Sequence, residues 1–148
     1  MPDRAFLDAN ISIFAAGAPH PLREPCRRVL VEAARHPGAV YSSAEVLQEI
    51  LHVYARRGLP SRGAGIIYQL RDLLGDHVAP MTAEDVYWCL SANLHSSLQT
   101  RDRIHLAVMA RLNITNIISA DRAFDGVAGI TRLDPARLDE WSTTVFGS

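Results

Sequence analysis

The sequence predicts a single α/β domain with a mainly parallel sheet of about five strands and helices on both faces. Short apolar runs alternate along the chain with segments of helical periodicity, which indicates strand–helix–strand units. The chain has 148 residues, 48% of them hydrophobic and 21% charged, enough for one domain with a substantial core. We find no internal repeat. We therefore expect one domain over 1–148, with a core at about 4–135 and a C-terminal tail at 136–148.

The first half of the chain begins with a short strand that is buried on both faces. Residues 5–7 are apolar and end at Asp8. An apolar segment follows and stops near Gly17, and residues 21–35 carry apolar side chains at helical spacing. A second short strand is expected at 40–41.

A pair of helices follows the second strand. Ser42 or Ser43 can cap the first helix and Ser61 the second, which predicts a helix pair over 44–74 that is interrupted near Gly58. The pair has more apolar positions than one internal face needs. Two interpretations of this excess stay open: it belongs to the core, or part of it forms a dimer surface.

The second half supplies three more strands and two more helices. Because consecutive parallel strands are joined by right-handed crossovers, these helices complete a three-layer arrangement. The expected strands are 77–79, 116–119 and 129–132, and the expected helices are 82–94 and 101–112, with a polar loop at 95–100.

Composition excludes several classes of protein. All fifteen basic residues are arginine, so chemistry that needs a lysine, such as a P-loop or a Schiff base, is excluded. The only cysteines, Cys26 and Cys89, are too few for a disulfide framework or a four-cysteine zinc site. No apolar run is long enough to cross a membrane, and the N-terminus does not resemble a signal peptide. We therefore expect a cytoplasmic protein with reduced thiols.

Four acids occupy positions that can converge at one edge of the sheet. Asp8 directly follows the first strand, and Asp121 follows the fourth by two residues. Asp102 lies in the first turn of a helix, and Glu49 lies one turn along another. Each acid alone has an ordinary explanation as a cap or a solvated residue. Together, clustered carboxylates predict a site for Mg²⁺ or Mn²⁺, ions that can activate water against a phosphodiester.

Four segments resemble the PIN domain family, and within it the VapC-type toxins of bacterial toxin–antitoxin pairs. The resemblance covers about residues 4–135, and it rests on the order and spacing of the motifs more than on any one of them. The segments are 6–10 (FLDAN), 46–50 (VLQEI), 100–107 (TRDRIHLA) and 117–125 (IISADRAFD).

The resemblance implies a Mg²⁺- or Mn²⁺-dependent endoribonuclease on a three-layer α/β/α fold. The residues that match the catalytic and metal-binding acids of the family are Asp8, Glu49, Asp102 and Asp121. Asn10 and Ser119 match supporting polar residues. The resemblance also implies an RNA substrate, a homodimer and a cognate VapB-like antitoxin that blocks the site.

Some roles and some functions stay open at this stage. The roles of Glu45 and Asp125 are undecided, and we expect a structural or surface role for His105. One alternative function is a non-catalytic PIN-like RNA-binding or interaction module, which predicts a missing acid, whereas all four positions are filled. Another is a flap-endonuclease-like DNA nuclease, a class that is usually longer and has more acids.

Overall fold

A computed structural model describes residues 3–91 and 98–147 and contains one five-stranded sheet in which all pairs of strands are parallel. The strand order is β3-β2-β1-β4-β5. The strands are β1 (Ala5–Leu7), β2 (Val40–Ser43), β3 (Val78–Ala79), β4 (Asn116–Ile118) and β5 (Thr131–Leu133). This architecture confirms the predicted fold class.

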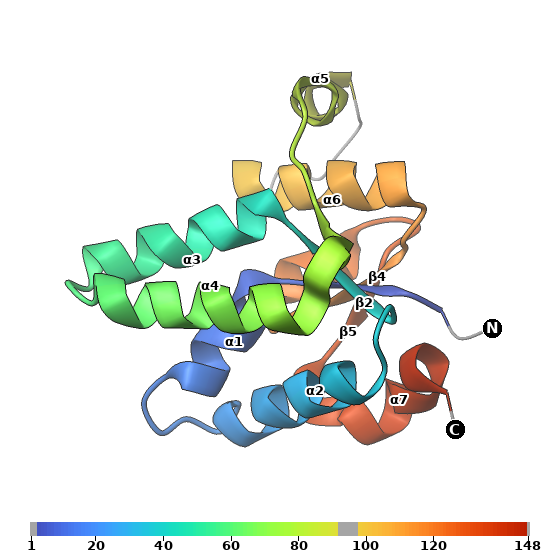
Figure 1. Ribbon diagram of the computed structural model, residues 1–148. Coiled ribbons are helices and arrows are strands. Elements are labelled where there is room, and N and C mark those ends of the chain that lie inside the picture. The colour runs from blue at the N-terminus through green and yellow to red at the C-terminus, as the bar shows by residue number, and fades with distance from the viewer. Residues whose placement is uncertain (1–2, 92–97, 148) are drawn as a thin grey trace.

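Helices cover both faces of the sheet (Figure 1). The helix α2 packs against α1 and α7, and α6 lies on the other side of the sheet with α5 packed on it. The hairpin of α3 and α4 extends beyond the sheet. The helices are α1 (Ala9–Ala16), α2 (Arg23–Arg35), α3 (Ala44–Arg56), α4 (Pro60–Leu74), α5 (Ala83–Ser91), α6 (Thr100–Leu112) and α7 (Leu138–Phe146), with 3₁₀ turns η1 (Gly75–His77), η2 (Arg122–Gly126) and η3 (Pro135–Arg137).

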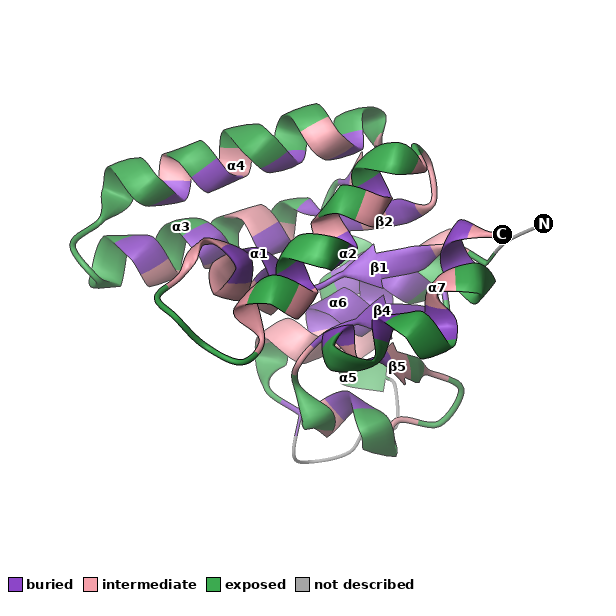
Figure 2. Ribbon diagram, turned by 90° about the horizontal axis from the view of Figure 1, so that it is seen from below, coloured by how far each residue is buried: buried purple, intermediate pink, exposed green. Residues whose placement is uncertain are grey.

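The register of the central strands decides where the site forms. Leu7 at the end of β1 pairs with Ile118 at the end of β4. Both strands are fully buried, because helices cover the sheet on each side (Figure 2). The residues that follow the two strands, Asp8 and Ser119, therefore emerge side by side at the carboxyl edge.

Several boundaries differ from those expected from the sequence. The helix expected to begin after a Ser61 cap begins at Pro60, with Leu59 as the N-cap, because proline suits the first helical position. The fifth strand begins at Thr131, two residues later than expected, after a turn in which Gly129 has φ +78°. The polar loop expected at 95–100 ends earlier, since Thr100 already belongs to α6. Most of that loop, like the end of the helix expected at 82–94, lies outside the described residues.

The segment expected to be a C-terminal tail contains a packed helix. Trp141, Val145 and Phe146 of α7 are buried in the main core. The Trp141 indole donates a hydrogen bond to the Asp134 carbonyl at 2.8 Å, and the backbone N–H of Asp3 donates to the Thr144 carbonyl at 2.8 Å. These hydrogen bonds join α7 to the residue that follows β5 and to the segment that precedes β1.

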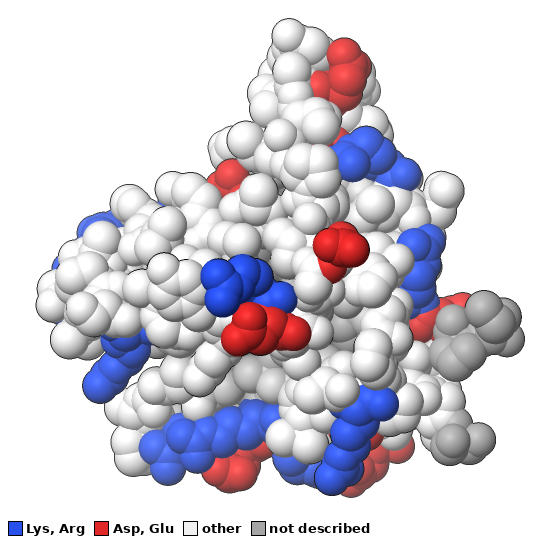
Figure 3. Space-filling view, in the orientation of Figure 1, with Lys and Arg blue, Asp and Glu red and all other residues white. Residues whose placement is uncertain are grey.

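The thiols and the surface charges have ordinary surroundings. Cys26 and Cys89 are both free, and burial raises the pKa of the Cys26 thiol to about 12, which makes it a poor nucleophile. Arginines and acids alternate over the face drawn in Figure 3 without forming one basic patch there. Within the described residues, no helix is long and apolar enough to span a membrane.

Candidate metal centre and catalytic site

The candidate site forms at the carboxyl edge of β1 and β4. Asp8 follows β1 directly and is buried, while Ser119 follows β4 and is also buried. Asp121 comes two residues after Ser119. In open parallel sheets this edge, next to the central strands, is where ligands bind. The position of the two aspartates thus agrees with the sequence expectation that they share one edge.

A hydrogen-bond network joins Asp8 to the segment that follows β4. The Ser119 hydroxyl donates to Asp8 Oδ2 at 2.7 Å and accepts from the backbone N–H of Asp121 at 3.0 Å. Asn10 Nδ2 donates to Asp8 Oδ2 at 3.2 Å and to Ser119 Oγ at 3.0 Å. Asn10 Oδ1 accepts from the N–H of Ala120 at 3.1 Å. The network fixes one oxygen of Asp8 and the backbone that carries Asp121.

Three of the four predicted acids also cap a helix or a 3₁₀ turn. Asp8 Oδ1 accepts from the Ala9 N–H at 2.8 Å, and Asp121 Oδ1 accepts from the Ala123 N–H at 2.9 Å. Asp102 Oδ2 accepts from the Gln99 N–H at 3.2 Å and completes a capping box. The ordinary explanation as caps is therefore correct for these three acids. It is compatible with a shared site, because the charges of Asp8 and Asp121 both act on Asp102.

The acids interact strongly enough to alter one another's protonation. Burial, together with the charges of Asp8 and Asp121, raises the pKa of Asp102 to about 6 despite its backbone hydrogen bond. Burial also raises the pKa of Asp8, with Glu49 adding to the effect, while His105 and Ser119 oppose it. Each of the four predicted acids thus interacts with at least one other, through the pairs Asp8–Glu49, Asp8–Asp102 and Asp102–Asp121.

His105, for which the sequence favoured a structural or surface role, lies against the acids of the candidate site. It lies on α6 three residues after Asp102 and is fully buried. Its Nε2 is 3.6 Å from Asp8 Oδ1 and 3.7 Å from Glu49 Oε1. Burial lowers the pKa of His105, but its contact with Glu49 and the charges of Asp8, Glu49 and Asp102 outweigh this, so the pKa is raised. The sequence offers one signal of its position: His105 is the one polar residue in the apolar run 104–109.

The two acids with undecided roles both pair with arginines. Glu45 lies 3.6 Å from the guanidinium of Arg101. Asp125 is exposed and accepts from Arg132 Nε at 2.7 Å and from Nη2 at 3.3 Å. Arg132 Nη1 also donates to the Ser119 carbonyl at 2.9 Å. This arginine therefore links the two ends of the segment from Ser119 to Asp125 by hydrogen bonds.

The chemistry of the donor set fits a divalent cation. One ligand atom from each of Asp8, Glu49 and His105 can be chosen so that all three lie within 4.8 Å of one another. Clustered carboxylates in a partly buried place need a counter-charge, and oxygen ligands are those that Mg²⁺ and Mn²⁺ prefer. The site therefore has the composition of a metal centre.

The family model named PIN domain matches residues 5–130. This chain belongs to the PIN domain family. Among curated proteins, this PIN domain is 37% identical over 130 residues to ribonuclease VapC13 of Mycobacterium tuberculosis, covering 86% of this chain and 97% of the relative. It is 33% identical over 117 residues to ribonuclease VapC23 of the same species, covering 78% and 91%.

Solved structures show the same fold at lower sequence identity. VapC20 of Mycobacterium tuberculosis, described as a sarcin–ricin loop cleaving toxin, superposes with a TM-score of 0.65 at 18% identity, covering 85% of this PIN domain and 98% of that chain. VapBC2 of Rickettsia felis, solved with a DNA fragment from its promoter, gives a TM-score of 0.63 at 11% identity, covering 88% and 98%.

Proposed function

We propose that this PIN domain is a metal-dependent endoribonuclease that acts as the toxin of a VapBC-type toxin–antitoxin pair. The observation that carries the proposal is the set of interacting acids at the carboxyl edge of β1 and β4. The names of the curated relatives as VapC ribonucleases support the choice of RNA as substrate. We expect the protein to act in the cytoplasm, where RNA is available.

In this proposal the metal-binding and catalytic residues are Asp8, Glu49, Asp102 and Asp121. A bound Mg²⁺ or Mn²⁺ would supply positive charge to the scissile phosphate and activate water. Asp8 is positioned for this by Ser119 and Asn10, which occupy its Oδ2. Glu49, on α3, is the acid we assign to orient the attacking water and accept its proton.

The proposal is tested by incubating total cellular RNA with the purified protein in Mg²⁺ or Mn²⁺. We expect discrete fragments that disappear with EDTA and with Asp8→Asn, because the variant loses a charge at the centre of the cluster. Asp72→Asn is the matched control, since Asp72 is an exposed residue of α4 that pairs only with neighbouring Arg71 in the described structure.

Each alternative function predicts a different result. Binding of RNA without cleavage by the folded, metal-loaded protein would favour a non-catalytic module. Cleavage of a branched DNA duplex in preference to RNA would favour a flap-endonuclease-like enzyme. Cleavage that persists in Asp8→Asn would contradict the site assignment.

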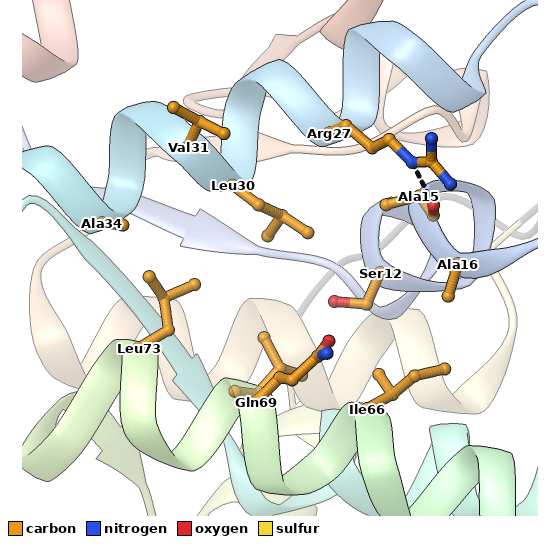
Figure 4. Close-up of a pocket in the computed structure, with 11 residues that line it drawn as sticks. Ser12, Ala15, Ala16, Arg27, Leu30, Val31, Ala34, Ile66, Gln69 and Leu73 are labelled. Atoms are coloured by element: carbon orange, nitrogen blue, oxygen red, sulfur yellow. Dashed lines mark hydrogen bonds between the residues drawn. The ribbon is translucent and has the colours of Figure 1, made fainter.

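We further propose that a VapB-like antitoxin occupies an apolar groove beside the site. The groove has a volume of about 590 Å³ and lies between α1, α2 and α4 (Figure 4). Its apolar walls include Ala15, Ala16, Leu30, Val31, Ile66 and Leu73. Because α1 begins immediately after Asp8, a segment bound along α1 can continue over the acids. The size and apolar lining suit an amphipathic helix.

One polar atom in the groove supports an external ligand. The Ser12 hydroxyl is buried and has no hydrogen-bond partner among the described residues. Figure 4 shows it pointing into the space between the helices. Buried hydroxyls are almost always hydrogen-bonded, so a partner that reaches Ser12 would satisfy it.

We also propose that the protein forms a homodimer through α5. Three apolar side chains on one face of this helix are exposed: Val86 by 42%, Tyr87 by 59% and Leu90 by 83%. The helix packs on α6 and stands away from the rest of the molecule in Figure 1. An apolar helix face of this kind is typical of a surface that a second protein covers.

A further inference from the structure

His105 is a buried polar side chain that faces two carboxylates without forming a hydrogen bond with either. The ring is fully buried on α6, and neither ring nitrogen has a hydrogen-bond partner among the described residues. Its near neighbour is the Phe6 ring of β1, with a centroid separation of 5.4 Å, a contact that an apolar side chain would make equally well. Burial of a polar ring without partners is unfavourable, so the imidazole needs a role beyond packing.

The unpartnered nitrogen faces the carboxylates of the site. Nε2 lies 3.6 Å from Asp8 Oδ1 and 3.7 Å from Glu49 Oε1. Both separations are longer than a hydrogen bond, which for N–H···O is about 2.7–3.2 Å. They are shorter than about 4.2 Å, the greatest separation of two atoms that ligate one ion at about 2.1 Å each. The imidazole nitrogen is therefore spaced from each of the two carboxylate oxygens as one ligand of a cation is from another, and not as in a hydrogen bond.

We propose that His105 is a nitrogen ligand of the divalent cation, so that the site binds Mn²⁺ in preference to Mg²⁺. This inference rests on the proposed metal-dependent function and identifies the ion that serves it. Mg²⁺ prefers a shell made only of oxygen and gains little from imidazole, whereas first-row transition ions accept nitrogen readily. Asp8 and Glu49 supply oxygen ligands that either ion accepts. The nitrogen ligand from His105 raises the affinity for Mn²⁺ more than that for Mg²⁺.

The test measures the ligand directly. Mn²⁺ is bound to the full-length protein, and the electron spin echo envelope is recorded for the ¹⁴N modulation of coordinated imidazole. We expect this modulation in the wild type, its change to the ¹⁵N pattern in protein labelled only at histidine, and loss of the Mn²⁺ signal in Asp8→Asn. The wild-type measurement does not depend on the folding of any variant at position 105.

Affinities of the two ions give a second measurement. Calorimetric titration of His105→Gln should show Mn²⁺ affinity lowered about tenfold or more while Mg²⁺ affinity changes much less, because glutamine offers only an oxygen ligand. His52→Gln is the matched control, since it makes the same change at an exposed residue three positions after Glu49 on α3.

The outcomes separate this inference from the proposed function. Mn²⁺ bound through Asp8 without ¹⁴N modulation, in a protein that still cleaves RNA, would overturn the histidine ligand alone. Equal loss of Mn²⁺ and Mg²⁺ affinity in His105→Gln would also overturn it. Cleavage of RNA with no bound divalent ion would overturn both this inference and the metal dependence of the proposed function.

Discussion

The carboxyl group of Asp102 links the charge of the site to the stability of the fold. Its pKa lies at about 6 in the folded chain, against an ordinary value of 3.8, because the group is half-buried near Asp8 and Asp121. Between these two values the folded state keeps a proton that the unfolded chain releases. This group therefore makes the metal-free protein less stable as the pH rises from about 4 to about 6.

Asp102→Asn removes that destabilising effect while leaving a side-chain oxygen to cap α6. We expect the metal-free variant to melt a few degrees above the wild type at pH 7.5 and at the same temperature near pH 4. Thermal unfolding of both proteins across this range measures the difference. A difference that does not change with pH would contradict the raised pKa. Mg²⁺ or Mn²⁺ should raise the Tm of the wild type more than that of the variant.

Ser119 is the residue on which the geometry of Asp8 depends most directly. Ser119→Ala removes the donor to Asp8 Oδ2 and the acceptor for the Asp121 N–H. We expect cleavage to fall about tenfold to a hundredfold, as when a partner of a metal ligand is lost, and stability to fall by about 1–2 kcal/mol. Cleavage rate and denaturant unfolding are measured on the same preparation.

Ser42→Ala separates positioning from stability. Ser42 is also buried, and its hydroxyl donates to the Leu7 carbonyl at 3.0 Å. This variant should lose similar stability and keep most of its activity. If both variants lose activity in proportion to stability, Ser119 has no positioning role.

At the scale of single residues, the sequence predicted the acids that the structure brings into interaction with one another, but not the histidine beside them. Asp8 could be placed because it directly follows a short apolar strand, and Asp121 because it comes two residues after another. Ser119 was indicated by the resemblance to the PIN domain family. Asp102 could be placed because an acid is common in the first turn of a helix. His105 could not be placed, because helical spacing brings it near Asp102 but does not tell whether the interior supplies its hydrogen bonds.

At the scale of elements, α5 is held firmly although much of its surface is exposed. Arg111 of α6 donates to both oxygens of the buried Asp85 carboxylate, at 3.1 and 3.0 Å, and to the Pro80 carbonyl at 2.6 Å. Burial raises the pKa of Asp85, but the hydrogen bonds from Arg111 and Thr82 and the charge of Arg111 together outweigh it. The pKa is therefore lowered and the pair stays charged at neutral pH. A fixed helix with an apolar outer face is suited to association, because little order is lost on binding.

Leu90→Asp should shift the protein from dimer to monomer. The substitution places a charge in the centre of the proposed interface, where it would lose its water. Light scattering after size-exclusion chromatography measures the mass. Leu51→Asp tests the other surface suggested by the sequence, the outer side of the α3–α4 hairpin, where Leu51 is 51% exposed. Dissociation by Leu51→Asp alone would move the interface to the hairpin.

Element boundaries show what apolar spacing does and does not determine. The spacing placed α2, α3 and α6 well, because their apolar faces are continuous. It did not identify α7, since one turn of apolar residues near a chain end looks the same whether it packs or not. Its packing is accompanied by a hydrogen bond from Trp141 to the Asp134 carbonyl and a long-range one from the Asp3 N–H to the Thr144 carbonyl, which spacing does not encode.

At the scale of the whole molecule, the order of strands could be anticipated only in part. Alternation of strands and helices predicts a parallel sheet, and right-handed crossovers limit the arrangements. The apolar run of β1 indicates an interior strand, and the structure places it between β2 and β4. The helix α1 begins directly after Asp8, and its residues Ser12, Ala15 and Ala16 line the groove, so one short helix borders both the acids and the groove.

That adjacency allows inhibition by a partner to be separated from catalysis. Val31 lines the groove on α2 and lies outside the set of acids. In Val31→Asp the charge would be desolvated by a bound apolar helix, so affinity for the cognate VapB-like antitoxin should fall about tenfold to a hundredfold. Metal-dependent cleavage without antitoxin should match the wild type. The measurement is RNA cleavage against increasing antitoxin.

Tyr68→Asp provides the control for this prediction. Tyr68 is an exposed residue of α4 that does not line the groove, so it tests whether any new negative charge on these helices repels the partner. We expect Tyr68→Asp to be inhibited like the wild type and Val31→Asp to escape. Equal inhibition of all three proteins would exclude the groove as the binding surface. The antitoxin could then still inhibit by covering the acids, because a segment that covers Asp8 needs to contact only the carboxyl edge of the sheet.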